Sequence, residues 1–374
     1  MKGNVTTYIM FYLFGMMHTM SYTTSLLLGF TLDMERGVYG LLLLLLYYKY
    51  LDRRTIYLNI AVLYISIFTS IYTFDIKAHV QECIGFVLYY NVALIFWKVL
   101  GSRQLTPTER LKHFYSFLSI PLLVYISPIL LTPNNINLDF YSDPNLEKIG
   151  LKSRTVGWAS ACSIPMVLQW TRKDGPRKFI IYLALAILIV LTIGSGSRSA
   201  IIGASLFVLA LIYSFNIKQR ISYAILLIFF TAFILQNLDQ LSLSRRAELH
   251  KMGVSDDTFR QNLVLAFSEH LVEDFPSSLK PEGLGEPNIQ HGLNKFFDTK
   301  GFGTHNSYIS IILGLGFFSI IFLYRMFRGL KKLARLNYLK YFLPFLTISI
   351  TEDCFGPGQL LYFFLIGSMV VLTE

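Results

Sequence analysis

The chain has 374 residues and a formal net charge of +10; 53% of its residues are hydrophobic and only 15% are charged. Soluble domains carry about 25% charged residues, so this composition excludes an ordinary soluble enzyme, a disordered chain and a disulfide-held secreted scaffold. The three cysteines, Cys83, Cys162 and Cys354, lie far apart and have no metal-binding or disulfide spacing. The composition predicts an all-α, polytopic membrane protein.

Apolar runs recur along the whole chain. A membrane-spanning helix needs roughly 20 predominantly apolar residues. Runs near this length, some of them shorter, predict about twelve spans. We expect all of them to belong to one integral membrane domain, residues 1–374. The predicted spans are 5–31, 37–50, 55–74, 80–100, 113–132, 155–170, 179–195, 199–215, 221–238, 306–324, 341–351 and 358–372. A large loop, 239–304, separates the ninth span from the tenth.

Lysine and arginine in the short loops predict the orientation, because basic loops stay in the cytoplasm. The basic residues of one set of alternate loops are Lys49, Arg53, Arg54, Arg103, Arg110, Lys112, Arg172, Lys173, Arg177, Lys178, Lys218, Arg220, Arg325, Arg328, Lys331, Lys332, Arg335 and Lys340. This pattern places both termini inside and the 239–304 loop outside. We interpret the positive charge as topological bias and expect no nucleic-acid partner.

Several arginines break this pattern, because external loops are normally poor in them. The arginines predicted to face outward are Arg154, Arg198, Arg245, Arg246 and Arg260. A negatively charged ligand on the outer face would explain their position.

The first candidate site is the turn at 194–200, with the sequence Gly-Ser-Gly-Ser-Arg-Ser-Ala, which ends one span and starts the next. Its glycines permit a tight turn, and serine is a good helix N-cap. Arg198 then lies in the first turn of an outward-facing helix N-terminus, where free N–H groups and the helix dipole favour an anion. The alternative is an interfacial arginine that reaches the lipid headgroups.

The second candidate is Arg260, which follows Asp257-Thr258-Phe259 in the large loop. Asp256, Asp257 and Thr258 are candidate N-caps for a loop helix, so Arg260 also falls in a first helical turn. The alternative is an ion pair with Asp256 or Asp257. The loop helix is predicted from an apolar stripe at i+4 spacing, formed by Leu263, Phe267, Leu271 and Phe275.

The third candidate is the segment 301–308, in which two glycines lead to Thr304 as the predicted cap and to His305 at the outer start of the tenth span. Histidine can exchange a proton near neutral pH. The alternative is a hydrogen-bonded interfacial histidine. The other loop histidines, His250, His270 and His291, have no comparable setting, and no metal site is predicted.

Together these stretches resemble the O-antigen ligase and polymerase superfamily of bacterial envelope glycosyltransferases. Ser197-Arg198 between two spans is similar to its short serine or threonine–arginine turn, and Arg260 before a helix is similar to its large-loop arginine motif. Thr304-His305-Asn306-Ser307 resembles its histidine–asparagine motif. The resemblance covers about 150–325 in matching order. Arg154 belongs to a weaker upstream element, in which Gly157-Trp158 replaces the usual asparagine–proline pair.

The resemblance implies transfer of a glycan from undecaprenyl diphosphate on the periplasmic face of a bacterial inner membrane, without metal or cofactor. Arg198 and Arg260 would hold the diphosphate, and His305 would act as general base on the acceptor hydroxyl. The resemblance assigns four further residues to substrate binding or to orienting His305, namely Arg154, Ser197, Asn306 and Ser307.

The acceptor separates the alternatives. A ligase of lipopolysaccharide biosynthesis transfers the chain to lipid A core, whereas a polymerase transfers it to another lipid-linked unit. Polymerases of this superfamily often show two sizeable external loops that bear arginines, and the single large loop here favours a ligase over an O-antigen or exopolysaccharide polymerase. A polysaccharide or lipid transporter is the alternative of another class, but transporters usually carry ionisable residues at the bilayer midplane, and these are scarce here.

Overall fold

The computed structural model describes residues 5–28, 35–102, 105–131, 153–171, 178–195, 197–213, 256–297, 306–335, 338–352 and 365. Every regular element in these residues is a helix, so the predicted all-α class is confirmed. The predicted spans 221–238 and 358–372 lie outside the described residues, apart from Leu365.

The helices coincide closely with the predicted apolar runs. In chain order they are α1 (Val5–Leu28), α2 (Glu35–Tyr47), η1 (Tyr48–Tyr50), α3 (Arg53–Ser70), α4 (Ile76–Leu100), α5 (Pro107–Leu131), α7 (Ser153–Thr171), α8 (Lys178–Gly194), α9 (Arg198–Tyr213), α11 (Asp256–Glu273), η4 (Ser277–Leu279), α12 (Glu286–Leu293), α13 (Ser307–Leu315), η5 (Gly316–Phe318), α14 (Ser319–Arg335), η6 (Leu339–Phe342) and α15 (Leu343–Thr351). Most breaks between helices fall where the sequence places loops.

Two stretches of the described chain are helical, long and apolar enough to cross a membrane, Ile76–Leu100 and Ser307–Lys332. The second is interrupted, because Gly316 adopts a φ of 54° between α13 and η5. The shorter apolar helices are Thr7–Met17, Gly37–Tyr50, Thr55–Ser70, Thr155–Leu168, Ile181–Gly194, Arg198–Tyr213 and Leu339–Thr351. The total of about twelve spans stays a prediction.

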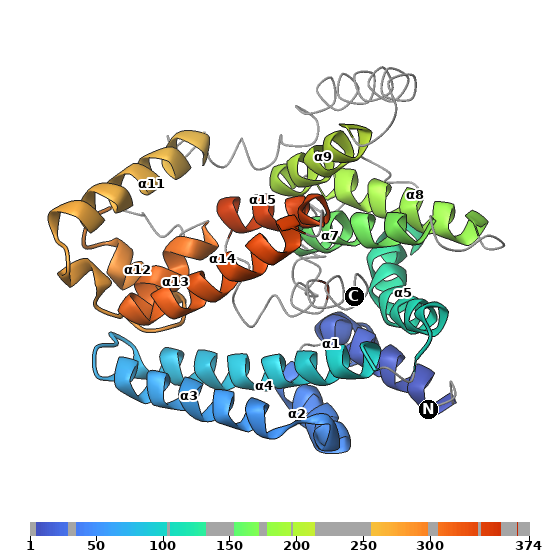
Figure 1. Ribbon diagram of the computed structural model, residues 1–374, viewed down its shortest axis with the longest axis horizontal. Helices are drawn as coiled ribbons and strands as arrows, with labels where there is room; N and C mark the ends of the chain where they lie inside the picture. The colour runs from blue at the N-terminus through green and yellow to red at the C-terminus, as the bar shows by residue number, and fades with distance from the viewer. Residues whose placement is uncertain are drawn as a thin grey trace.

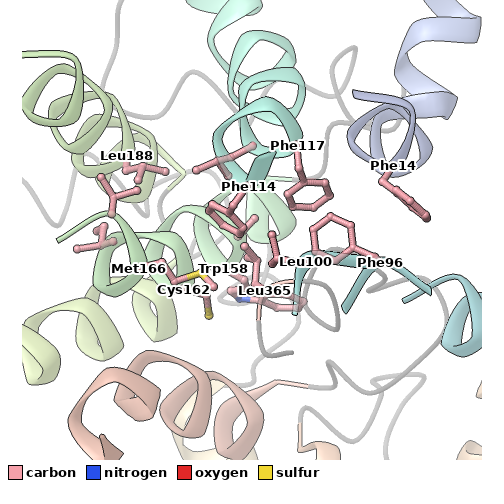
Figure 2. Packing of buried hydrophobic residues seen from close by; sticks show 14 of the residues in the cluster. Phe14, Phe96, Leu100, Phe114, Phe117, Trp158, Cys162, Met166, Leu188 and Leu365 are labelled. Atoms are coloured by element: carbon pink, nitrogen blue, oxygen red, sulfur yellow. The ribbon is translucent and has the colours of Figure 1, made fainter. Parts of the chain in front are cut away.

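The main core joins the N-terminal helices to the central ones. α1 packs along α5, α7 packs against α8 and α9, and α15 covers α9 (Figure 1). Figure 2 shows aromatic side chains of this core, which runs from Phe14 of α1 through Phe96 of α4 and Phe117 of α5 to Trp158 of α7. Many large apolar side chains also cover the outward faces of α2, α3 and α8. Such faces are unfavourable in water and fit a lipid environment.

A second, smaller core belongs to the large loop. The apolar residues that form it are Leu263, Phe267, Ile289, Leu293, Ile309 and Leu313. It joins α11 and α12 to α13, so the described part of the loop packs as one body with the start of the following helix. The predicted apolar stripe is therefore correct for Leu263 and Phe267 and for the partly buried Leu271, whereas Phe275 follows the end of α11 and is 64% exposed.

Candidate functional site

The turn before α9 is held against α7 by serine hydroxyls. The backbone N–H of Ser197 donates to Ser195 Oγ at 3.3 Å, and the hydroxyls of Ser197 and Ser199 lie 3.2 Å apart. The indole N–H of Trp158 donates to Ser199 Oγ at 3.3 Å. A Cβ at Gly157 would lie 2.9 Å from Ser197 Cβ, so only glycine leaves room for the turn at this point. Ser197 is buried, and Arg198, half-buried, is the first residue of α9.

α9 and α15 pack against each other in antiparallel orientation. A Cβ at Gly203 would lie 2.8 Å from Pro344 Cα, and the rings of Phe207 and Tyr341 have centroids 5.8 Å apart. Residue numbers therefore rise along α9 as they fall through α15 and the preceding η6. Figure 1 shows α9 and α15 side by side. Because both helices rise about 1.5 Å per residue, Arg198 lies near the level of Ser349, close to the C-terminal end of α15.

The start of α13 is fixed to the same end of α15. Ser307 Oγ donates to the carbonyl oxygen of Glu352 at 2.7 Å, and the hydroxyls of Tyr308 and Ser349 lie 2.9 Å apart. The side-chain oxygen of Asn306 accepts from the N–H groups of residues 308 and 309 at 2.9 and 3.2 Å. Asn306 is thus the N-cap of α13, which corrects the prediction that Thr304 caps this helix.

Glu352 is a residue that the sequence reasoning missed. It is 5% exposed and is the C-cap residue of α15. Buried carboxylates are rare unless they are paired or hydrogen-bonded. Its only signal in the sequence is an acidic residue placed directly after an apolar helix.

The N-termini of α9 and α13 therefore lie near the C-terminal end of α15, together with Arg198 and Glu352. The N-termini of α9 and α13 carry positive dipole ends, and Arg198 adds a full positive charge at the first of them. Oxygens of phosphate fit the start of α9, because a helix N-terminus and a guanidinium can both donate to them. At the start of α13 the N–H groups of residues 308 and 309 are already bound by Asn306, so that helix contributes its positive dipole end.

The structure places some of the predicted site residues near one another, and the others lie wholly or partly outside the part of the chain that it describes. Ser197, Arg198, Asn306 and Ser307 belong to the two helix starts that lie at the end of α15. Arg154 is the second residue of α7 and Arg260 the fifth of α11, but their side chains lie outside the described part of the structure. His305 lies outside the described residues altogether.

Comparisons with known proteins give no further identification. No family model, curated protein or solved structure matches the chain. In the described ranges, no group of three histidine, cysteine, aspartate or glutamate side chains is placed to hold a metal ion.

Proposed function

We propose that the chain is a membrane glycosyltransferase that acts as an O-antigen ligase. It would transfer a polysaccharide from undecaprenyl diphosphate to lipid A core on the periplasmic face of the bacterial inner membrane. The feature that supports this most directly is that two helix N-termini, one with Ser197-Arg198 and one with Asn306-Ser307, are both placed near the C-terminal end of α15. The first is placed there by antiparallel packing of α9 on α15, and the second by the bond from Ser307 to Glu352.

Arg198 and the N-terminus of α9 would bind the diphosphate of the donor, together with Arg260 and Arg154, and the dipole end of α13 would add positive potential. As the acceptor oxygen attacks the anomeric carbon, the bond from that carbon to the diphosphate oxygen breaks and its electron pair stays on the leaving diphosphate. The growing negative charge would be stabilised by these donors. The transferred glycan remains on the outer side of the membrane.

His305 would accept the proton that the acceptor hydroxyl loses. The neighbouring residues position it: Asn306 fixes the first turn of α13 through its capping oxygen, and Ser307 ties that turn to Glu352. We therefore assign Asn306 and Ser307 to positioning the base. The diphosphate is itself the leaving group, so the proposed reaction uses no cofactor or metal.

Lipopolysaccharide from a strain that lacks the protein tests this proposal. A ligase predicts that polymer disappears from the core while lipid-linked chains accumulate. Core that carries a single repeat unit would identify a polymerase instead. An unchanged ladder, together with no lipid-linked intermediate, would contradict both and favour a transporter. The predicted topology, with about twelve spans and both termini in the cytoplasm, can be tested with reporter fusions in the same strain.

A further inference from the structure

The segment 279–288 of the large loop is held between the α3–α4 turn and α13. Figure 1 shows α3 and α4 running along one side of α12, α13 and α14, and α12 contacts α4. The sequence resemblance does not extend to these N-terminal helices. The side chain of His79 and the backbone of Asp75, at the start of α4, nevertheless bind the loop directly.

His79, in the first turn of α4, is 1% exposed and fully engaged. The backbone N–H of Leu284 donates to its Nδ1 at 2.9 Å. An accepting Nδ1 carries no proton, so we assign the ring proton to Nε2, which lies 3.0 Å from both the Ser66 carbonyl oxygen and the Thr69 hydroxyl. The contact with the loop thus requires a neutral imidazole, because a protonated Nδ1 would face the N–H of Leu284 donor to donor.

Asn288 makes the second attachment and is completely buried. Its side-chain oxygen accepts from the N–H of Asp75 at 2.6 Å, and its amide donates to the carbonyl oxygens of Asp75 and Leu284 at 2.9 and 2.7 Å. One amide therefore joins the turn before α4 to the loop segment. Gly283 and Gly285 have φ values of 95° and 96° and allow the chain to approach α4 closely.

The same segment holds α13. The N–H of Glu282 donates to the carbonyl oxygen of Leu313 at 2.8 Å, and the N–H of Gly283 donates to the carbonyl oxygen of Gly314 at 3.1 Å. A Cβ at Gly314 would lie 2.9 Å from Leu284 Cδ2. Leu284, which His79 binds, is thus in direct contact with the helix whose first turn carries Asn306 and Ser307.

We propose that neutral His79, with Asn288, positions α13 by docking the 279–288 segment, and that protonation of His79 at acidic pH releases this segment and lowers transfer. His79 is a positioning residue in this scheme and touches no substrate. The kinetic consequence rests on the proposed function, whereas the docking and its release do not. Since the loop lies on the outer face in the predicted topology, the pH that matters is the one outside the cytoplasm.

Other titratable groups surround this contact. At the start of α4 they are the N-cap residue Asp75, Glu82 and Cys83, and the sulfur of Cys83 lies 3.5 Å from His79 Nε2. The two residues that His79 meets on α3, Ser66 and Thr69, do not titrate. On the loop, Glu282 is buried against Lys295 and His291. Substitutions at His79 therefore isolate its contribution from that of these groups.

Two substitutions separate the two nitrogens. His79→Asn places an amide oxygen near the position of Nδ1, which can still accept from Leu284 and does not titrate. His79→Gln places an amide N–H near Nε2, which keeps the contact to Ser66 but removes the acceptor for Leu284. The first variant should stay docked at every pH, and the second should be released at every pH.

The readout is thiol labelling of the full chain in membrane vesicles with a membrane-impermeant maleimide. Ser278→Cys reports opening, because Ser278 is buried directly before the docked segment, and the adjacent Ser277→Cys is the exposed reference. Peptide mass spectrometry distinguishes these sites from the native cysteines. The ratio of the two labelling rates cancels the pH dependence of thiol chemistry.

With His79 intact, the rate ratio of position 278 to position 277 should rise about tenfold as the pH falls from about 8 to about 5. It should stay low throughout in His79→Asn and stay high throughout in His79→Gln. The rate of transfer from the lipid-linked donor should fall in acid for wild type, and the His79→Asn variant should retain more of its rate. A pH-independent ratio in wild type, or a low ratio for His79→Gln at neutral pH, would overturn the docking proposal. If the ratios behave as expected but wild type shows no transfer at any pH, the proposed function is what fails.

Discussion

Ser307, the first residue of α13, donates its hydroxyl to the carbonyl oxygen of Glu352 at the end of α15 over 2.7 Å. This bond links helices that follow two different predicted loops. Because α9 packs antiparallel on α15, the bond from Ser307 to Glu352 also places the first turn of α13 near the turn that carries Arg198. Neither helix start could assemble the site alone, so α15 is the element that aligns them.

Glu352 should therefore matter for transfer beyond its effect on folding. Glu352→Gln keeps the size of the side chain and the backbone acceptor for Ser307 but removes the buried charge. We expect this variant to insert and fold normally and to transfer at least about tenfold more slowly, since a small displacement of reacting groups has effects of this size or larger. Transfer is measured in membranes with a lipid-linked donor.

The matched control for this variant is Glu286→Gln, an exposed carboxylate in the first turn of α12. It should leave transfer unchanged. Equal rates for Glu352→Gln and wild type would exclude Glu352 from the site.

Arg198 is expected to stabilise the departing diphosphate. Arg198→Ala should reduce transfer by a factor of about 10² to 10³, by analogy with the loss of one oxyanion donor, which costs about 2.7–4 kcal/mol of transition-state stabilisation. Arg198→Lys should recover part of this loss, because it restores the charge but not the two-pronged geometry. Glycan ladders and in vitro transfer both measure the effect.

The comparison variant for Arg198 is Arg328→Ala, on an exposed face of α14 that is predicted to lie in the cytoplasm. It removes the same charge far from the proposed site and should transfer normally. Near-normal ladders from Arg198→Ala would remove Arg198 from the reaction.

Gly157 should tolerate no side chain, because a Cβ there would collide with Ser195 Oγ and lie 2.9 Å from Ser197 Cβ. Gly157→Ala must push the turn before α9 away from α7, and overpacking of this kind costs about 1–3 kcal/mol of stability. We expect a lower melting temperature together with reduced transfer. Gly329→Ala is the control, since a Cβ at Gly329 meets nothing within 4 Å. A Gly157→Ala variant as stable and active as this control would contradict the packing described here.

The sequence predicts helices well where local signals determine them. The apolar run 80–100 corresponds to α4, and the i+4 stripe from Leu263 to Leu271 locates α11. The start of α11 is predicted less well, because Asp256 and the two cap candidates after it lie inside the helix and Arg260 falls in its second turn. The interruption of the run 306–324 was not predicted, because it depends on Gly316, whose missing Cβ would meet the carbonyl oxygen of Leu279 from the loop. No periodicity within the run reports such a long-range contact.

Polar contacts between distant segments were also missed. His291 was given no distinct setting, yet its ring stacks on Phe74 with centroids 4.5 Å apart and its Nδ1 lies 3.3 Å from Glu282. His79 and Leu284 are 205 residues apart in the chain. Such pairs follow from the packing of helices, and one sequence carries no signal for them.

Asp52 provides a test of the scaffold that is independent of transfer. Its carboxylate caps α3 by accepting from the N–H of Thr55 at 2.9 Å and pairs with Lys98 near the end of α4 at 2.8 Å. The hydrogen bond from Lys98, followed by those from Thr55, holds the pKa of Asp52 below its ordinary range. A carboxyl with a lowered pKa in the folded state stabilises the fold above the pKa of the unfolded chain, and this contribution is lost as the pH falls.

Asp52→Asn keeps a capping oxygen but loses the charge, whereas Asp52→Ala loses both. Near neutral pH the melting temperature should therefore decrease from wild type to Asn to Ala. As the pH falls below the ordinary aspartate value of about 3.9, the difference between wild type and Asn should shrink, while the capping difference between Asn and Ala should persist. Thermal unfolding of the purified protein in detergent measures both differences. A gap between wild type and Asn that is the same at neutral and acidic pH would show that the Lys98 pairing does not stabilise the fold.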